Sequence, residues 1–462
     1  MHFFIAKKCE LWYNDIYMQC GEKQDFCNQD LCGQSTRKHC TPQGYQASSA
    51  IYDLVVVGAG PAGLMAAGCA AARGLGVAVL EGNAKCGKKL YITGKGRCNL
   101  TNDTNAQGVL DNVVSNPKFL YGALHKFAPK DTIDFFESRG LPLVVERGGR
   151  VFPFSQKASD VTSVLQQNAQ KGGVKFFLET KVTGVQCCEQ GASSKFVVKS
   201  SGRQFFANSV LIATGGKSYA MTGSDGSGWA LAKNLGHNLV APMPALVAIE
   251  FVQDTKPLQG LSLRNINCKI LHKAKVVKEI FGEMVFTDKG ASGPIILSAS
   301  SLINRWSLAD TRLQLDLKPG LSFEKLDERV LRDFALYQNK DFINALDDLL
   351  PTKLIPYIVQ KVGIAPHKKV NTIARQERQN FVNMLKKLEF EPSKLGGIDF
   401  GIVTAGGVDT KQIDPKTMQS KIVPGLYFAG ECIDVDALTG GYNVQIALST
   451  GHLVGNSVGE NI

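Results

Sequence analysis

Residues 51–64 read IYDLVVVGAGPAGL, a short apolar and β-branched run that leads directly into a glycine-rich turn. A run of this kind without polar alternation is typical of a strand buried on both faces of a parallel sheet. The alanine-rich stretch that continues to Arg73 has the small residues and helix formers of a closely packed helix. A second apolar run, residues 76–80, ends at Glu81. The sequence therefore predicts a strand, a turn, a helix and a second strand in succession.

The turn has the spacing G-x-G-x-x-G, formed by Gly58, Gly60 and Gly63, with Ala62 between the last two. In such a unit the first glycine permits the tight turn, the second lets a pyrophosphate approach the backbone, and the third lets the helix pack closely on the strand. The helix N-terminus then faces the phosphates. Glu81, 23 residues beyond Gly58, can accept hydrogen bonds from a ribose. The complete unit predicts a dinucleotide-binding site rather than a glycine turn without a ligand.

The C-terminal part of the chain holds a second segment of this style. The strand-like residues 425–429 lead into Gly430 and Glu431, and Thr-Gly-Gly at 439–441 opens an apparent helix. An acid just past a strand can bind ribityl hydroxyls, and amides at a helix start can stabilise negative charge on a reduced flavin ring. Two nucleotide-binding elements, one near each end, suit a long cofactor such as FAD, and a structural strand with a glycine turn is the alternative.

We expect an α/β protein with a discontinuous Rossmann-like FAD-binding domain and an inserted β-barrel-like plus helical domain. The FAD-binding domain comprises residues 51–245 and 396–462, and the insert comprises residues 246–395. Residues 1–50 form an N-terminal extension that we expect to be flexible. The patterns also predict helices over residues 120–139 and 158–170 and between 323 and 388, and strands over residues 180–185, 209–213, 246–251, 267–271 and 313–317.

The chain has a formal charge of +11, to which its first 50 residues contribute nothing. Such a field attracts phosphate-bearing cofactors, nucleic acid or anionic substrates without identifying which. No block of five or six Lys and Arg residues occurs, so nucleic acid is not the expected partner. No apolar run approaches the roughly 18 residues that span a bilayer, and no secretory signal is evident, so we expect a cytoplasmic protein without membrane contact.

Twelve cysteines are present, and five of them lie in the first 50 residues, at Cys9, Cys20, Cys27, Cys32 and Cys40. None of these five forms a C-x-x-C pair or has the spacing of a zinc ribbon, so no metal site is expected. In a reducing compartment the scattered cysteines are expected to be reduced and mostly buried.

Six further motifs extend the pattern beyond the first glycine turn. They are GKKL at residues 87–90, GKGRCNLTN at 94–102, GRVFP at 149–153, ATGG at 213–216, FTDKGASGP at 286–294 and DVDALTGGYN at 434–443. On these motifs the chain resembles, over residues 51–462, the HI0933-like (YhiN/BaiN, aminoacetone-oxidase-like) flavoproteins, a family with an FAD domain interrupted by an insert. The resemblance implies an FAD-dependent oxidoreductase.

By this resemblance, Gly96, Arg97, Cys98 and Asn99 lie on a loop that passes near the flavin. The Arg97 guanidinium is a fixed multidentate donor for phosphate, ribityl or substrate carbonyl groups, and a loop-stabilising ion pair is the alternative. Cys98 has no partner cysteine at the short spacing of flavin disulfide reductases, so a packed thiol is favoured over a redox thiol.

Further cofactor-binding candidates stand at the second helix start. Gly441, Tyr442 and Asn443 begin the helix that should face the isoalloxazine ring, where Asn443 can bond a ring carbonyl or cap the helix. Lys89 is a candidate for binding an anion, with a surface ion pair as the alternative.

The adenosine half of the cofactor has its own candidates. Thr214 and Gly215 follow the strand at 209–213 and resemble the second flavin-domain turn of the wider two-dinucleotide superfamily. By the same analogy the backbone of Val182 is expected to contact the adenine.

The resulting hypothesis is an FAD-dependent oxidoreductase that transfers a hydride through flavin N5 to or from a small organic substrate. There is no second complete strand, G-x-G-x-x-G turn and acid, so NAD(P)H is expected only as a transient electron donor. Two alternatives remain open: a non-catalytic flavin-binding sensor and an RNA-modifying flavoenzyme. No catalytic acid or base and no oligomeric state follow from the sequence.

Overall fold

The computed structural model describes residues 46–189 and 191–460. Most of the expected N-terminal extension, with all five of its cysteines, lies outside the described residues. The first strand, β1 (Gln46–Val57), begins five residues before the apolar run that predicted it. The seven cysteines within the described ranges are free thiols.

A parallel sheet lies in the hydrophobic core of the part of the chain outside the insert. Its strand order is β6 (Lys175–Phe177), β2 (Val77–Leu80), β1, β9 (Arg203–Ile212) and β19 (Leu426–Phe428), and every neighbouring pair is parallel. Leu54 stands opposite Val77 on one side and Ser209 on the other. Because β19 comes from the C-terminal segment, the sheet is completed only by residues far from β1 in sequence.

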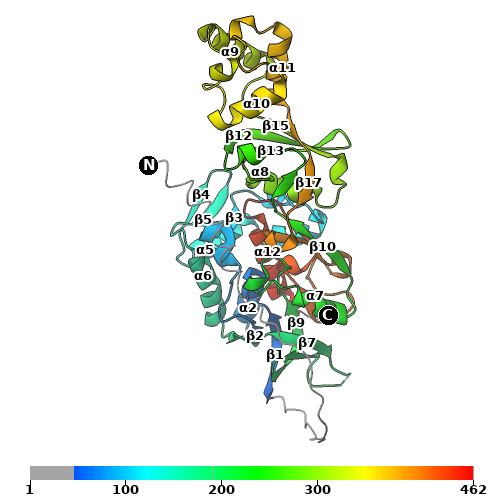
Figure 1. Ribbon diagram of the computed structural model, residues 1–462. Helices are drawn as coiled ribbons and strands as arrows, with labels where there is room; N and C mark the ends of the chain where they lie inside the picture. Colours follow the sequence, from blue (N-terminus) through cyan, green and yellow to red (C-terminus); the bar gives the residue numbers. More distant parts are fainter. Residues whose placement is uncertain (1–45, 190, 461–462) are drawn as a thin grey trace, which may run out of the picture. The chain divides into compact units, whose positions relative to one another are not determined.

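The central strand is apolar because both faces of the sheet are covered. Leu54, Val55 and Val56 are fully buried, as expected for a parallel sheet with layers on either side. The helix α2 (Pro61–Ala72) packs against the sheet, and α12 (Tyr442–Ser457) packs along α2 (Figure 1). A Cβ added at Gly451 of α12 would stand 2.3 Å from the carbonyl oxygen of Ala62, so the two helices approach closely.

Smaller elements surround this sheet. The strands β7 (Val182–Cys187) and β8 (Phe196–Ser200) are antiparallel, and β8 pairs with the first half of β9. Two further antiparallel sheets join β3 (Thr101–Asn102), β5 (Arg150–Pro153) and β4 (Leu143–Glu146), and β10 (Leu239–Ala245) with β18 (Val403–Val408). The remaining helices of this part are α3 (Ala106–Leu110), α4 (Tyr121–Lys126), α5 (Pro129–Glu137), α6 (Ala158–Lys171) and α7 (Ser227–Asn234).

The single helix expected over residues 120–139 is wrong, because the chain breaks between α4 and α5. Phe127 leaves the helical region at φ −148°, and Pro129 takes the first position of α5. Proline has no N–H and disfavours helical geometry in the residue before it, so it starts a helix more readily than it continues one. The Asp131 carboxylate accepts a hydrogen bond from the Ala128 N–H at 2.7 Å and fixes this new start.

The insert contains a curled antiparallel sheet. Its strands, in spatial order, are β16 (Leu388–Phe390), β15 (Thr311–Asp316), β12 (Ser262–His272), β13 (Lys275–Phe286), β14 (Gly290–Ser292), β11 (Ile249–Phe251) and β17 (Pro392–Leu395). Only Glu391 separates the two end strands, β16 and β17, which lie on one run of chain. The sheet therefore closes on itself in a barrel-like way. The strand expected from residue 246 begins only at Ile249, because Leu246 has a left-handed backbone with φ 55°.

Helices complete the insert. The helix α8 (Pro294–Ile303) follows β14, and α9 (Phe323–Leu336), α10 (Ile355–Val362) and α11 (Arg375–Lys386) gather beyond β15 (Figure 1). They share one buried apolar core with the curled sheet, in which Leu326, Phe342 and Phe390 are fully buried. No helix of the described residues is both long enough and apolar enough to cross a membrane.

Candidate active site

The carboxyl ends of the parallel strands bring four predicted site segments to one edge of the sheet. Gly58 follows β1, Glu81 follows β2, Thr214 follows β9 and Gly430 follows β19. Because these strands are parallel, all four segments emerge on the same side. In open α/β sheets this is the edge at which ligands bind.

The glycine turn has the geometry that a phosphate-binding turn requires. Gly58 adopts φ 103°, and a Cβ there would lie 2.6 Å from the Ala213 carbonyl oxygen. A Cβ at Gly63 would lie 2.0 Å from the Gly58 carbonyl oxygen. At Gly60, by contrast, the nearest described atom would be 4.0 Å away, and no side chain caps α2. The first turn of α2, with Ala62, thus keeps open space beside its uncapped N-terminus.

Glu81, just after β2, is fixed by hydrogen bonds from the glycine turn after β1 and from Asn83. Its Oε2 accepts a hydrogen bond from the Ala59 N–H at 2.8 Å, and its Oε1 accepts from the Asn83 N–H at 2.8 Å and side chain at 2.7 Å. The Asn83 amide also donates to the Thr222 carbonyl oxygen. Sequence reasoning missed Asn83, although an amide two residues past the acid is a detectable local signal.

Lys89 and Glu431, predicted separately, form one ion pair. The Lys89 Nζ lies 2.8 Å from Glu431 Oε2 and donates to the Ser218 hydroxyl at 2.7 Å. Glu431 Oε1 accepts from Ser218 at 3.1 Å and from the Thr404 N–H at 2.8 Å. Both charged side chains are about one-fifth exposed. Four segments far apart in sequence therefore meet at this carboxylate, and no motif pointed to Ser218 or Thr404.

Arg97 forms an ion pair with Glu146, as the alternative interpretation of a loop-stabilising ion pair predicts. Its guanidinium lies 2.7 Å from the Glu146 carboxylate, donates to Gln156 at 2.8 Å and stands 4.1 Å from the centre of the Phe152 ring. The group remains one-third exposed.

The loop that carries Arg97 has unusual backbone geometry. Gly94, Lys95, Gly96 and Cys98 all have positive φ, between 57° and 84°. The Cys98 side chain is fully buried, and burial raises the pKa of its thiol to about 12. The thiol is therefore neutral at physiological pH, which fits a packed residue rather than a thiolate.

Asn99 joins this loop to the start of α12. With its amide oriented to satisfy its neighbours, the side chain accepts from the Gly441 N–H at 3.0 Å and donates to the Thr101 carbonyl oxygen at 2.9 Å. Gly441 itself has φ 95° and precedes the first residue of α12. The structure thus brings together the two predicted segments that were expected to flank the flavin ring.

Asn443 holds the loop before α12. Its side chain accepts from the Ala437 N–H at 2.9 Å and donates to the Ala437 carbonyl oxygen at 2.8 Å. The helix-cap interpretation of Asn443 is wrong, because α12 has Gly441 at its N-cap and no side-chain cap. Its neighbour Tyr442 is partly buried, and burial raises the pKa of its phenol.

Asp436 is a buried acid that sequence reasoning did not single out. Its side chain is 1% exposed, and its carboxyl oxygens have no hydrogen-bond partner among the described residues. Burial raises its pKa to about 6, while the nearby Arg305 acts to lower the pKa. Only the burial and missing partners distinguish this acid, and neither can be read from the sequence.

The same loop is tied to the insert. Asp434 pairs with Arg305, which follows α8, at 3.0 Å, and the Ser298 hydroxyl of α8 lies 3.2 Å from that of Thr439. The Asn116 side chain donates to Asp434 at 2.9 Å. The insert and the C-terminal loop are thus linked by side chains at the residues just before α12.

Of the adenosine candidates, Val182 follows a segment that is hydrogen-bonded to Glu81. The Thr180 N–H donates to the Glu81 carbonyl oxygen at 2.8 Å, two residues before Val182 begins β7. Gly215 has φ 75°, and the Thr214 hydroxyl is buried without a partner among the described residues.

The chain has a parallel sheet with this glycine turn, a C-terminal strand and helix that complete the sheet, and an antiparallel insert between the two parts. These features define the FAD-binding Rossmann-like fold of flavin-dependent oxidoreductases. The family model described as HI0933-like protein Rossmann domain matches residues 52–457. The chain belongs to this family, as its motifs indicated.

Three relatives span most of the chain. A 3-dehydro-bile acid delta(4,6)-reductase of Clostridium scindens is 30% identical over 410 residues, covering 88% of this chain and 98% of the relative. A ribosomal RNA dihydrouridine synthase of Haemophilus influenzae is 30% identical, covering 87% of this chain and 98% of the relative. The protein of the same name from Escherichia coli is 29% identical, covering 86% and 96%.

Proposed function

We propose that the chain binds FAD along the carboxyl edge of its parallel sheet and reduces a carbon–carbon double bond conjugated with a carbonyl group. The observation that carries the proposal is the meeting, at one edge, of the first glycine turn with Glu431 of the C-terminal segment, which pairs with Lys89. Two anchoring elements on the same edge, one after β1 and one after β19, suit a dinucleotide rather than a mononucleotide.

The residues at this edge fit FAD. The open space at Gly60 and the uncapped start of α2 suit the pyrophosphate, and Glu81 suits the ribose. Val182, Thr214 and Gly215 belong to the adenosine half. The buried Thr214 hydroxyl has no hydrogen-bond partner among the described residues, so it is free to bond a polar ligand.

The flavin end of the site consists of the Arg97 loop and the start of α12. Asn99 and Asn443 fix the Gly441 and Ala437 backbone, and the N-terminal end of α12 favours negative charge on the ring beside it. Lys89 balances the charge of Glu431. When bound, FAD supplies the hydride through N5. NAD(P)H serves as a transient donor at the same edge, since the sequence has only one complete strand–turn–acid unit.

The substrate class follows from what two relatives have in common. A 3-dehydro-bile acid with 4,6 double bonds and the uracil ring both present an alkene conjugated with a carbonyl group. The first relative is named for the reduction, and the second is named for its reduced product, dihydrouridine. A small conjugated enone is therefore the first candidate, and a uridine in RNA is the second. The RNA candidate is favoured by the two dihydrouridine synthase relatives and by the +11 charge.

Anaerobic stopped-flow spectroscopy on the FAD-loaded protein tests the proposal. NADH or NADPH should bleach the flavin absorbance, and the reduced protein should be reoxidised without oxygen by a cyclic enone or by ribosomal RNA. Mass spectrometry should then find two added hydrogens in the acceptor. A flavin that is reduced but reoxidised only by oxygen would contradict the proposed reaction and leave FAD binding intact.

A further inference from the structure

Two segments connect the insert with the part of the chain that holds the parallel sheet. One joins β10 to β11, and the other joins β17 to β18. The Gly396 N–H of the second segment donates to the Ala248 carbonyl oxygen of the first at 3.0 Å. Further along, the Ile402 N–H donates to the Leu246 carbonyl oxygen at 3.4 Å. The two segments therefore run side by side at these two points.

Between these two hydrogen bonds the second segment is longer than the first. It has the five residues 397–401, and only Val247 lies opposite them. The extra chain forms one 3₁₀ turn, η9 (Ile398–Phe400), in which the Phe400 N–H donates to the Gly397 carbonyl oxygen at 3.1 Å. Extra residues in one strand of an antiparallel pair re-aim side chains, often beside active sites. We call residues 397–401 the excursion.

The excursion presents an aromatic ring to solvent. Phe400 is 62% exposed, whereas Gly401 and Val403, which follow it, are buried. Its ring rests against Gly397, where a Cβ would lie 3.7 Å from the ring atom Cδ2. A single exposed aromatic residue needs no explanation by itself, because apolar atoms are common on protein surfaces. The place of Phe400 in the fold is what distinguishes it.

Phe400 stands beside the residues that hold Glu431. The Ile402 carbonyl oxygen accepts from the Ser218 hydroxyl at 3.4 Å, and the Thr404 N–H donates to Glu431 at 2.8 Å. Phe400 precedes Ile402 by two residues, which span at most about 7 Å of extended chain. The exposed ring is therefore next to the Glu431 end of the carboxyl edge of the parallel sheet, where the insert joins it.

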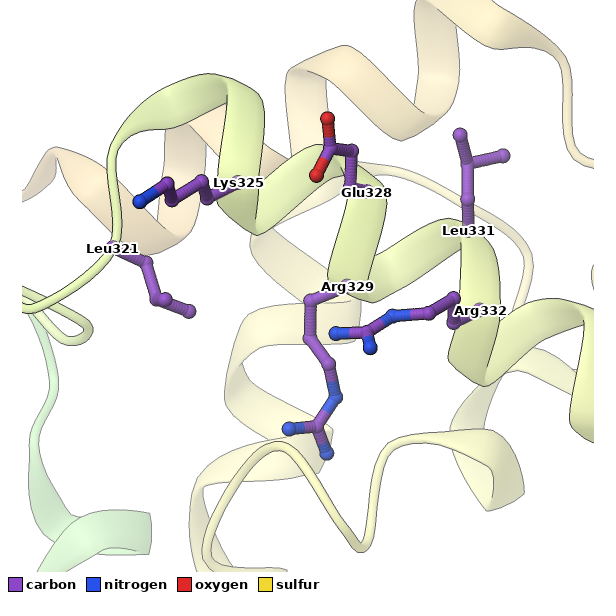
Figure 2. Close-up of a pocket in the computed structure, with 6 residues that line it drawn as sticks. All are labelled: Leu321, Lys325, Glu328, Arg329, Leu331 and Arg332. Atoms are coloured by element: carbon purple, nitrogen blue, oxygen red, sulfur yellow. The ribbon is translucent and has the colours of Figure 1, made fainter.

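A hollow of about 580 Å³ on α9 offers no comparable surface. It is lined by Leu321, Lys325, Glu328, Arg329, Leu331 and Arg332. Figure 2 shows these side chains along one helix and the turn before it, and none of them is aromatic. The helix carries four acids against three cations, and Arg329 is bound to Asp333. Because α9 packs in the core of the insert, which is distinct from the core around the parallel sheet, this hollow does not adjoin the carboxyl edge.

We propose that Phe400 forms an aromatic wall of the substrate site and stacks on a flat, conjugated ring. This inference rests on the proposed function and deepens it, because a ring that holds a double bond conjugated with a carbonyl group is flat around that bond. Aromatic side chains attract flat π systems in offset or edge-on arrangements, and such stacking tolerates different ring substituents. An open-chain enone offers less flat surface to Phe400. The wall therefore selects cyclic over open-chain enones.

Binding of a flat ring that the flavin cannot reduce tests the wall without turnover. On the full-length, FAD-loaded protein, 1-naphthol should shift the absorbance spectrum of the oxidised flavin and give a dissociation constant. Phe400→Ala should raise this constant about tenfold, the loss typical of one stacked aromatic side chain, and Phe400→Tyr, which keeps the ring, should stay within about twofold. The control Phe281→Ala removes a ring of 58% exposure from β13 of the insert. It should also stay within about twofold of the unmodified protein.

Chemically reduced flavin separates the wall from the proposed reaction. Protein reduced with dithionite is mixed without oxygen with 2-cyclohexenone or with the open-chain 3-buten-2-one, and reoxidation of the flavin is followed. Phe400→Ala should raise the half-saturating concentration of the cyclic enone about tenfold and that of the open-chain enone by less than about twofold. If naphthol binding depends on Phe400 but neither enone reoxidises the flavin, the proposed reaction fails and the ring-binding wall remains.

Four results would overturn the wall. They are no binding of 1-naphthol by the unmodified protein, unchanged naphthol affinity in Phe400→Ala, an equal loss in Phe281→Ala, and equal effects on the two enones. The FAD content of each variant, measured by visible absorbance, controls for folding. If Phe400→Ala does not retain FAD, Phe400→Leu keeps the apolar bulk without the ring and decides by the same naphthol titration.

Discussion

Glu81 and Glu431 occupy equivalent places, each just beyond a strand of the parallel sheet, yet they are held in different ways. Glu81 is fixed by the Ala59 N–H and by Asn83, all within 22 residues of the chain. Glu431 is fixed by Lys89, 342 positions away, and by Ser218 and Thr404. The first carboxylate accepts hydrogen bonds from uncharged groups at Ala59 and Asn83, whereas the second pairs with the Lys89 cation. We infer that the Glu81 end binds cofactor hydroxyls and the Glu431 end fixes the loops around the flavin.

The largest expected effect on FAD affinity comes from a larger side chain at Gly63, in the glycine turn that contacts Glu81. In Gly63→Val, the new side chain would meet the Gly58 carbonyl oxygen, which lies 2.0 Å from the Cβ position. Overpacking at this level costs about 1–3 kcal/mol or more, so FAD affinity should fall by about 100-fold. Equilibrium titration of the apoprotein with FAD measures this loss. Gly320→Val is the control, since a Cβ there meets no described atom within 4 Å. An equal loss of FAD affinity in that variant would contradict a specific role of the glycine turn in FAD binding.

The second effect concerns the acid buried on the Glu431 side. The pKa of Asp436 is raised to about 6 in the folded protein from an ordinary value of 3.8, so the folded state binds the proton more tightly than the unfolded state. The free energy of unfolding should therefore fall as pH rises from about 4 to about 6, by about 2–3 kcal/mol, and then level off. Asp436→Asn should abolish this fall and stabilise the protein at pH 7. Urea unfolding at both pH values measures it, and an unchanged pH dependence in the variant would contradict the assignment.

A third, smaller effect tests how strongly Lys89 and Glu431 are coupled. A double-mutant cycle with Lys89→Met and Glu431→Gln should give a coupling energy of about 1–2 kcal/mol, between the values typical of exposed and buried pairs, because both side chains are about one-fifth exposed. The matched control is the Lys181–Asp225 pair, whose lysine is 62% exposed. Its cycle should give less than about 1 kcal/mol. Equal couplings in the two cycles would mean that the Glu431 pair is an ordinary surface ion pair.

The smallest effect distinguishes ligand binding from structure at Glu81. Glu81→Gln keeps an acceptor for one backbone N–H but loses the charge, so FAD affinity should fall about fivefold, or about 1 kcal/mol. The rate of flavin reduction at saturating FAD should not change. Glu137→Gln, at an exposed acid of α5, serves as the control. A slower reduction step in Glu81→Gln would place this residue at the flavin ring instead.

The same contrast explains what the sequence could predict. The strand, glycine turn, helix and acid around Gly58 and Glu81 are consecutive, so their geometry follows from local rules of backbone conformation and packing. The break before Pro129 also had a local signal, and reading the apolar periodicity over residues 120–139 as one helix overlooked it. Local signals thus sufficed for the parallel sheet and for its first binding segment.

The rest of the site depends on tertiary contacts. The partners of Glu431 come from three distant segments, and the burial of Asp436 results from the packing of the loop before α12 beside Arg305 and Ser115. No spacing in the sequence encodes these encounters. Asn443 illustrates the same point, because a residue at a helix start suggested a cap or a flavin contact, and the structure shows it binding the backbone of Ala437.

The central claim is that both ends of the chain hold one flavin dinucleotide, and FAD stoichiometry tests it most directly. Apoprotein titrated with FAD and freed of unbound cofactor should retain one flavin per chain by visible absorbance. Gly63→Val at one end and the Lys89→Met, Glu431→Gln double variant at the other should each weaken that retention. A colourless protein after FAD is supplied, or full retention in both variants, would contradict the account.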